Sequence, residues 1–173
     1  MGYKLLSNEV NNLFEELKRE YMIYAPKRFL KQGRYSDTDI IKYGEVNSFQ
    51  EIVYKEKSTY PAKELITPIN QTLYFFTEDE FRESKNAYGD KKILIFARPC
   101  DINAQKRQDK TYLENGGFED AFYKRIREKV KFVCIECVEG FDTCFCTTMG
   151  SNKTDDYSLA VRFDENSALF NIN

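Results

Sequence analysis

The sequence predicts an α/β (α+β) fold whose mixed sheet contains a parallel strand-helix-strand unit. Residues 92–97 form a nearly continuous apolar run, as expected of a strand covered on both faces. A helical stretch follows, and residues 131–136 form a second apolar run. Two strands joined by a helical crossover are expected to be parallel, with a right-handed connection. The runs 157–163 and 168–172 predict a C-terminal hairpin that turns at residues 164–167.

The N-terminal half predicts one amphipathic helix and several shorter elements. Residues 7–20 carry apolar side chains at helical spacing, with Ser7 or Asn8 as the expected N-cap. A short apolar run ends before Pro26, and the polar residues 27–39 predict an exposed loop. Beyond that loop we expect a weak strand at 40–43, a short helix near 61–66 and an aromatic strand at 73–77.

The crossover between the two parallel strands predicts two helices. Asp101 is a suitable cap for a helix that runs to about Leu113, and Gly116-Gly117 interrupts the helical pattern. A second helix is expected over residues 118–129. Four phenylalanines that lie at helix or strand spacing are predicted to be core residues: Phe14, Phe75, Phe118 and Phe122.

The composition excludes several classes of function. The 173 residues include 28 acidic and 26 basic side chains, five cysteines and no histidine. Without imidazole the chain has no serine-histidine-aspartate triad, no Cys/His zinc finger and no histidine-ligated haem. Charges of both signs are interspersed and the net charge is −2, which favours neither nucleic acid nor an anionic membrane as a partner.

Length and hydropathy predict a single domain over residues 1–173, in a cytoplasmic protein. A chain of this length can bury one substantial core. The longest apolar stretch, residues 93–97, is too short to cross a bilayer, and residues 1–20 read as an amphipathic segment rather than a signal peptide. A reducing compartment disfavours disulfides, so the cysteines need another explanation.

The cysteines cluster at one predicted edge of the sheet. Cys134, Cys137, Cys144 and Cys146 fall within residues 134–146. Cys100 follows the first parallel strand and Cys137 follows the second, so we expect these two to be neighbours at the carboxyl edge. Cys134 lies inside its strand, where alternation predicts a buried structural thiol.

The other four thiols form a possible all-cysteine ligand set: Cys100, Cys137, Cys144 and Cys146. Four thiolates suit either a 4Fe-4S cluster or zinc. Structural zinc sites usually use two closely spaced cysteine pairs, whereas here three ligands come from one loop and one from a separate strand end, which favours a cluster. Three alternatives remain: a zinc-bound loop, a metal-free loop, and, more weakly, dithiol chemistry by Cys134 and Cys137.

Three segments resemble the A subunit of anaerobic sulfite reductases: Tyr24–Arg28, Ile95–Ala104 and Gly140–Gly150. The resemblance covers nearly the whole chain, and the Arg-Pro-Cys-Asp and Cys-Phe-Cys segments are also similar to beta subunits of soluble sulfhydrogenases. The family pattern falls on Cys100, Cys137, Cys144 and Cys146 and requires no cysteine at position 134.

The resemblance implies an electron-transfer role without catalysis by this chain. In that family electrons pass from a flavin subunit that oxidises NADH, through 4Fe-4S clusters, to a sirohaem subunit that reduces sulfite to sulfide. The related sulfhydrogenases imply hydrogenase chemistry as the alternative. A ferredoxin-like region with two further clusters follows the N-terminal domain in the family. Residues 1–173 contain no such motif, so we expect the chain to correspond to the N-terminal iron-sulfur domain.

Overall fold

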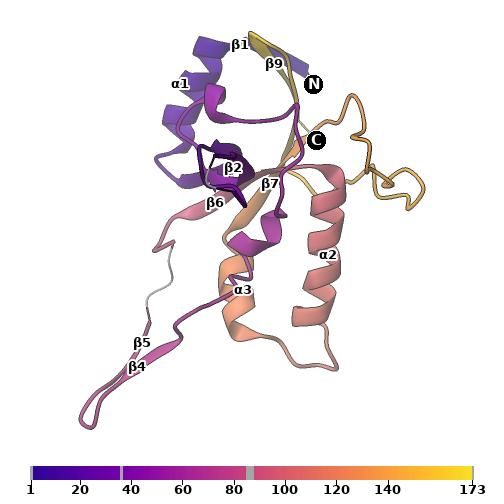
Figure 1. Ribbon diagram of the computed structural model, residues 1–173. Coiled ribbons are helices and arrows are strands. Elements are labelled where there is room, and N and C mark those ends of the chain that lie inside the picture. Colours follow the sequence, from indigo (N-terminus) through magenta and orange to yellow (C-terminus); the bar gives the residue numbers. More distant parts are fainter. Residues whose placement is uncertain (1, 36, 85–87, 173) are drawn as a thin grey trace.

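A computed structural model describes residues 2–35, 37–84 and 88–172 (Figure 1). The large sheet has seven strands in the order β1-β9-β8-β7-β6-β2-β3, and β4 and β5 form a separate two-stranded sheet. The large sheet comprises β1 (Gly2–Leu6), β2 (Tyr21–Phe29), β3 (Ile40–Glu45), β6 (Lys92–Ala97), β7 (Val130–Ile135), β8 (Leu159–Phe163) and β9 (Ser167–Ile172). The small sheet comprises β4 (Tyr74–Phe76) and β5 (Phe81–Glu83).

The described residues form three α-helices, α1 (Ser7–Leu17), α2 (Pro99–Leu113) and α3 (Ala121–Arg127). Two 3-10 helices, η1 (Phe49–Glu51) and η2 (Ala62–Leu65), lie in the connections. Among the residues that the structure describes, we find no helix with the length and apolarity needed to span a membrane.

The predicted mixed sheet, its parallel unit and the C-terminal hairpin are confirmed. β6 pairs in parallel with β7, and the register brings Ala97 opposite Cys134. β7 also pairs in parallel with β8, and β8 pairs antiparallel with β9. Helices α2 and α3 form the crossover between β6 and β7. The carboxyl ends of β6 and β7 therefore lie side by side at one edge.

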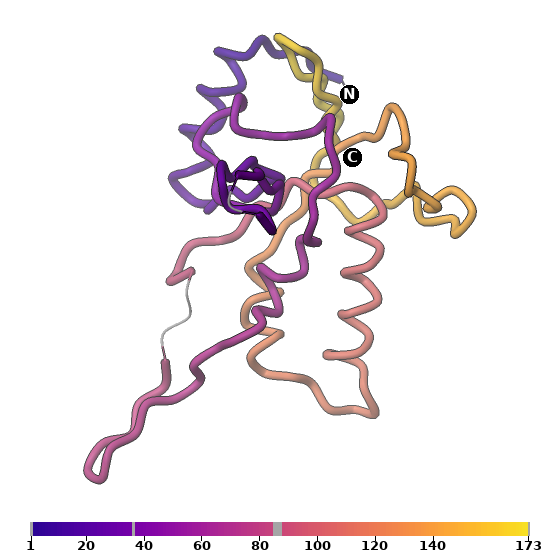
Figure 2. Tube along the Cα trace, in the orientation of Figure 1, coloured from indigo at the N-terminus to yellow at the C-terminus, as the bar shows by residue number. Residues whose placement is uncertain are grey.

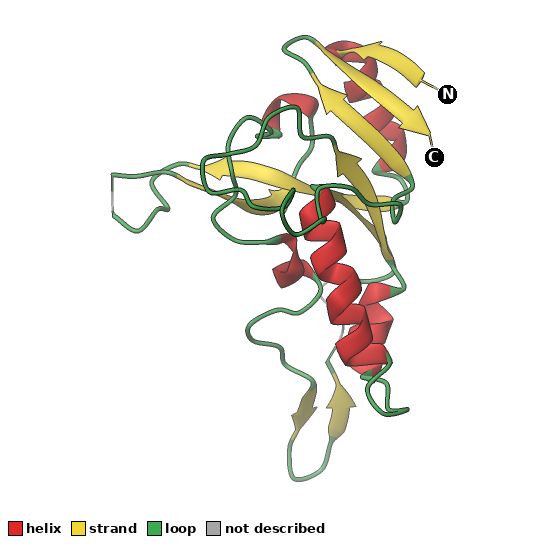
Figure 3. Cartoon of the chain, turned by 90° about the vertical axis from the view of Figure 1, so that its right-hand side faces the viewer, coloured by secondary structure: helices red, strands yellow, loops and turns green. Residues whose placement is uncertain are grey.

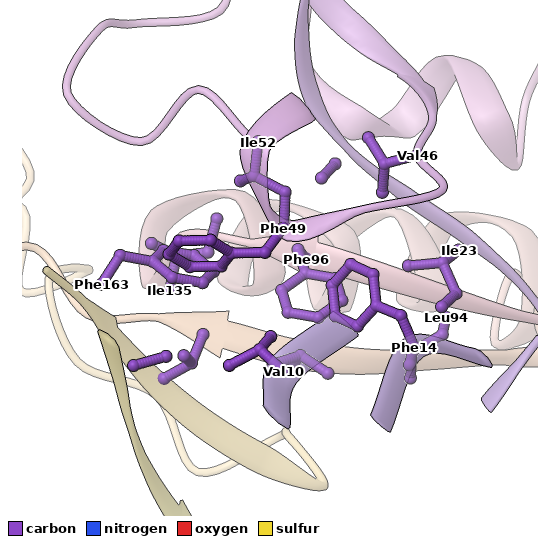
Figure 4. Packing of buried hydrophobic residues seen from close by; sticks show 14 of the residues in the cluster. Val10, Phe14, Ile23, Val46, Phe49, Ile52, Leu94, Phe96, Ile135 and Phe163 are labelled. Carbon is purple, nitrogen blue, oxygen red and sulfur yellow. The ribbon is translucent and has the colours of Figure 1, made fainter. Parts of the chain in front are cut away.

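Each face of the sheet has its own hydrophobic core. On one face Phe14 of α1 packs against Phe96 of β6 (Figure 4), and their ring centroids are 5.7 Å apart. On the other face Ile93 and Ile95 of β6 form a cluster with Ile102 of α2 and with residues of α3. The alternation of adjacent β6 residues between the two clusters explains why the strand is apolar throughout.

The N-terminus differs from the prediction in two respects. The N-cap of α1 is Leu6 rather than Ser7 or Asn8, and the Glu9 carboxylate accepts a hydrogen bond of 2.7 Å from the Leu6 N–H. Residues 2–6, predicted as part of an amphipathic segment, form β1, which pairs antiparallel with β9. This pairing joins the two ends of the described chain, so local periodicity carries no signal for it.

The strand β2 continues through Pro26, so the loop predicted over residues 27–39 is wrong at residues 27–29. Pairing of β2 with β6 ends at Tyr24, whereas pairing with β3 continues to Phe29. Pro26 therefore lies where β2 has a strand on one side only, a position in which a missing N–H is tolerated. The strand expected at 40–43 is confirmed and extends to Glu45, and the short helix expected near 61–66 is the 3-10 helix η2.

The crossover helices begin at other residues than predicted. The N-cap of α2 is Arg98 rather than Asp101, and α3 begins at Ala121 rather than at residue 118. The Asp120 carboxylate caps α3 by accepting hydrogen bonds from the N–H groups of Phe122 and Tyr123.

Two of the four phenylalanines predicted in the core lie outside it. Phe118 belongs to the turn between α2 and α3 and is 82% exposed, and Phe75 of the small sheet is 49% exposed. Phe14 is fully buried as expected. Phe122 is partly buried, with its ring 6.0 Å from that of Tyr74.

We predict that Phe96→Ala lowers the free energy of unfolding by about 3–5 kcal/mol, because it leaves a cavity between the rings of Phe14 and Phe163. Urea denaturation followed by circular dichroism measures this change. The control Phe118→Ala removes an exposed ring and is expected to change the stability by less than about 0.5 kcal/mol. Equal losses in the two variants would contradict this description of the core.

Candidate functional site

The strand register places Cys100 and Cys137 at the carboxyl edge of the sheet. Each lies three positions beyond the paired residues Ala97 and Cys134. Cys100 belongs to the first turn of α2 and is partly buried, whereas Cys137 is exposed in the loop after β7. The thiols of Cys137 and Cys146 are close enough to act electrostatically on that of Cys100. The expected proximity of Cys100 and Cys137 thus agrees with the structure.

A long loop between β7 and β8, which we call the cysteine loop (residues 136–158), carries the remaining candidate thiols. It lies beside the N-terminal end of α2 in Figure 2. A cavity of about 630 Å³ separates part of this loop from α2. Cys100, Cys144 and Cys146 line this cavity together with the cationic side chains of Lys57, Arg107 and Lys153.

Arg98 connects Cys137 to a separate part of the chain. Its side chain is 8% exposed, and its guanidinium lies 3.6 Å from the Cys137 Sγ. It also donates hydrogen bonds to the carbonyls of Tyr54 (2.9 Å) and Glu56 (3.1 Å) and lies over the Phe141 ring, 4.4 Å from its centroid. Arg98 therefore fixes both the segment after η1 and the beginning of the cysteine loop.

Polar side chains hold the cysteine loop against the body of the protein. The Asn103 amide on α2 donates to the carbonyls of Ser151 (3.1 Å) and Lys153 (2.7 Å). The Lys57 ammonium donates to the Thr143 hydroxyl over 3.1 Å. These contacts tie the loop at both ends of its Cys144–Cys146 segment, because the bonded residues flank the two cysteines.

Backbone hydrogen bonds shape the loop around these two cysteines. The Cys144 N–H donates to the Phe141 carbonyl over 2.8 Å, and the Phe141 N–H lies 3.3 Å from the Cys144 Sγ. The Ser151 N–H donates to the Cys146 carbonyl over 2.8 Å. Gly150, before that residue, has a φ of 64°, a conformation that a side chain would strain.

Burial dominates the electrostatics of the residues beside Cys100. Burial, followed by negative charge on Asp101, Cys137 and Cys146, raises the pKa of the Cys100 thiol to about 11. Burial also raises the pKa of Asp101, which is opposed by the hydrogen bond from the Tyr43 hydroxyl and by the charge of Arg98.

Cys134 is buried in the core, as its place inside a strand predicts, although its thiol is near enough to those of Cys137 and Cys100 to be affected electrostatically. It is 5% exposed and belongs to the core cluster shared with α2 and α3. Burial raises the pKa of its thiol to about 12. The thiol packs as a small apolar side chain, and its raised pKa disfavours the thiolate that dithiol chemistry with Cys137 would need.

The four candidate ligands are brought to one region but not into a ligand sphere. All five cysteines are free thiols, and no three Cys, Asp or Glu side chains within the described ranges are close enough to hold a metal ion. Three candidates surround one cavity, whereas the Cys137 sulfur contacts Arg98. The donor set suits an iron-sulfur cluster chemically, but the loop would have to close for four sulfurs to converge.

Sequence reasoning did not identify Arg98, Lys57 or Asn103 as part of this site. A signal existed for Arg98, since a cation directly after a fully apolar strand and before Cys100 occupies the same sheet edge. Lys57 lies in the connection between η1 and η2, and Asn103 lies on α2. Neither has a sequence spacing to the cysteines that would predict its contact with the loop.

Comparisons with protein-family models, with curated proteins and with solved structures found no match to this chain.

Proposed function

We propose that this chain is an electron-transfer domain that binds one 4Fe-4S cluster through Cys100, Cys137, Cys144 and Cys146. The observation that carries the proposal is the buried Arg98 guanidinium beside Cys137. Among the described residues no ion pair joins the Arg98 guanidinium to a carboxylate; Asp101 acts on it only through space, and its hydrogen-bonding partners are two carbonyls and one sulfur. A buried cation is costly unless an anion is close. Thiolate ligation at Cys137 would place an anion in direct contact with the guanidinium.

The arrangement of the loop also supports cluster binding. Cys100 is fixed by α2, whereas the other three thiols belong to one exposed loop that can adjust around a ligand. The Phe141 N–H donates to the Cys144 sulfur over 3.3 Å, and such hydrogen bonds tune a reduction potential. When bound, the cluster would supply one-electron transfer.

We further propose that the domain serves a larger oxidoreductase in the cytoplasm. The resemblance described above favours an anaerobic sulfite reductase complex, with a flavin subunit as electron donor and a sirohaem subunit as acceptor. The electron-transfer subunit of a hydrogenase is the alternative within the same class. Exposed apolar side chains next to the candidate ligands support contact with a partner there: Val138 at 71%, Phe145 at 70% and Met149 at 57% exposure.

A second candidate is a structural or interaction module whose cysteine loop is metal-free or binds zinc. One observation favours it, namely that Asn103, Lys57 and Arg98 hold the loop with hydrogen bonds that require no metal. In that case the thiols would have no redox role.

Anaerobic reconstitution with iron and sulfide distinguishes the two candidates. An electron-transfer domain is expected to become brown, to absorb broadly near about 400 nm and to bind about four iron and four sulfide per chain. Colourless protein that takes up one zinc, or no metal at all, would refute the cluster proposal. Iron, zinc and acid-labile sulfide are measured on the same anaerobic sample.

We predict that serine substitution separates the ligands from the core cysteine. Cys100→Ser, Cys137→Ser, Cys144→Ser and Cys146→Ser are each expected to reduce bound iron strongly, because each removes a thiolate. Cys134→Ser should keep the iron and lower stability by about 1–3 kcal/mol, because it buries a hydroxyl. Iron analysis and urea denaturation check both expectations. Loss of iron in the Cys134 variant with retention in the Cys100 variant would reverse the assignment.

We predict that Arg98→Gln makes the cluster harder to reduce, because it removes a buried positive charge beside Cys137. The expected change is roughly 60 mV towards negative potential, equivalent to about 1.4 kcal/mol for one electron. Redox titration followed by electron paramagnetic resonance measures it. The matched control is Arg107→Gln, an exposed cation on the cavity wall, with a smaller expected shift because solvent screens it. Equal potentials for wild type and the Arg98 variant would contradict this role.

A further inference from the structure

The small sheet β4–β5 forms a ribbon that extends away from the body of the protein, as Figures 1 and 3 both show. All six residues of its strands are exposed. Two exposed rings dominate it, Phe76 at 79% and Phe81 at 71% exposure. A two-stranded ribbon without a cover is only marginally stable in water, and large exposed apolar patches usually mark contact surfaces.

One face of the ribbon contacts the body of the protein at its base but not towards its tip. Its register pairs Tyr74 with Glu83 and Phe76 with Phe81, so these four side chains share a face. At the base, Tyr74 contacts the Phe122 ring of α3 at 6.0 Å and Glu83 pairs with Arg125. Beyond the base, Phe81 stacks on the Tyr74 ring with centroids 5.1 Å apart, and both Phe81 and Phe76 remain largely exposed. The core of this chain therefore covers only half of the apolar face.

On the opposite face of the ribbon, the apolar ring of Phe75 is partly covered by a neighbouring side chain. The guanidinium of Arg82 lies over the Phe75 ring, 5.1 Å from its centroid. A cation over an aromatic face is a favourable contact that leaves the charge in water. The most exposed apolar surface of the ribbon is thus on the face of Phe76 and Phe81.

We infer that this face pairs with the same face of a second copy of the chain, in an antiparallel arrangement about a two-fold axis. Such an isologous contact stacks Phe76 and Phe81 of one ribbon against those of the other and covers both.

Charge favours the antiparallel arrangement. The ribbon tip carries Glu78, Asp79 and Glu80, none of which forms an ion pair with a described residue. In the antiparallel pair each acidic tip approaches the base of the other ribbon, where Arg125 in the last turn of α3 pairs with Glu83. Arg125 already has Glu83 as one carboxylate partner and retains further N–H donors. This inference does not depend on the proposed cluster.

Sedimentation velocity of the 173-residue chain over a range of concentrations tests the inference. Wild type is expected to show a reversible monomer-dimer equilibrium, and Phe76→Ser with Phe81→Ser should weaken it by about tenfold or more. The matched control is Leu30→Ser with Tyr35→Ser, which removes two side chains of similar exposure, 70% and 65%, from the β2–β3 connection. This control should dimerise like wild type. Circular dichroism verifies that all variants are folded.

Two further measurements locate the contact. Amide hydrogen exchange in residues 73–84 is expected to slow as the wild-type concentration rises, and to be independent of concentration in the double phenylalanine variant. Glu78→Lys with Asp79→Lys should weaken the dimer several-fold because it reverses the charge of the tip. A wild-type chain that is monomeric at every concentration, or a dimer that survives the double phenylalanine substitution, would overturn the inference.

Discussion

The parallel pairing of β6 with β7 determines where most of the other elements lie. Parallel strands require a long crossover, and here that crossover supplies α2 and α3, which cover one face of the sheet. The opposite face is covered by α1, so both strands are apolar on both sides. Because of the same pairing, the residues that follow the two strands lie at one edge of the sheet. Arg98 and Cys100 follow β6, and Cys137 follows β7. The candidate site is a consequence of this pairing.

Arg98 is the residue through which the sheet edge and the cysteine loop are coupled. Its carbonyl accepts the first hydrogen bonds of α2, from the N–H groups of Asp101 and Ile102, while its side chain contacts Cys137 and Phe141. One residue therefore orients both the helix that carries Cys100 and the loop that carries the other thiols. A lysine could not replace it in full, because the planar guanidinium donates in several directions and stacks on the ring at once.

The sequence allowed the central part of the fold to be predicted, and the edges less well. Residues 92–97 and 131–136 were identifiable because burial on both faces leaves a continuous apolar run, and β6 and β7 were found within one residue of those bounds. The strand β1 was missed because its partner β9 lies at the other end of the chain. Aromatic periodicity misplaced Phe75 and Phe118, since spacing reports which residues share a face but not what covers that face. In the site, the proximity of Cys100 and Cys137 was predictable because each follows the end of one of two parallel strands. The contacts of Lys57 and Asn103 were not predictable, because they depend on the conformation of the cysteine loop.

The two proposed surfaces lie at different ends of the molecule, and this separation follows from the crossover. The cysteine loop lies beside the first turns of α2, while the β4–β5 ribbon is anchored by Phe122 and Arg125 of α3 (Figure 1). α2 runs from the carboxyl edge of the sheet towards its other edge, and α3 returns to the start of β7. A second copy bound at the ribbon would thus leave the cysteine loop accessible. The proposed self-association and the proposed electron transfer would therefore not compete for the same surface.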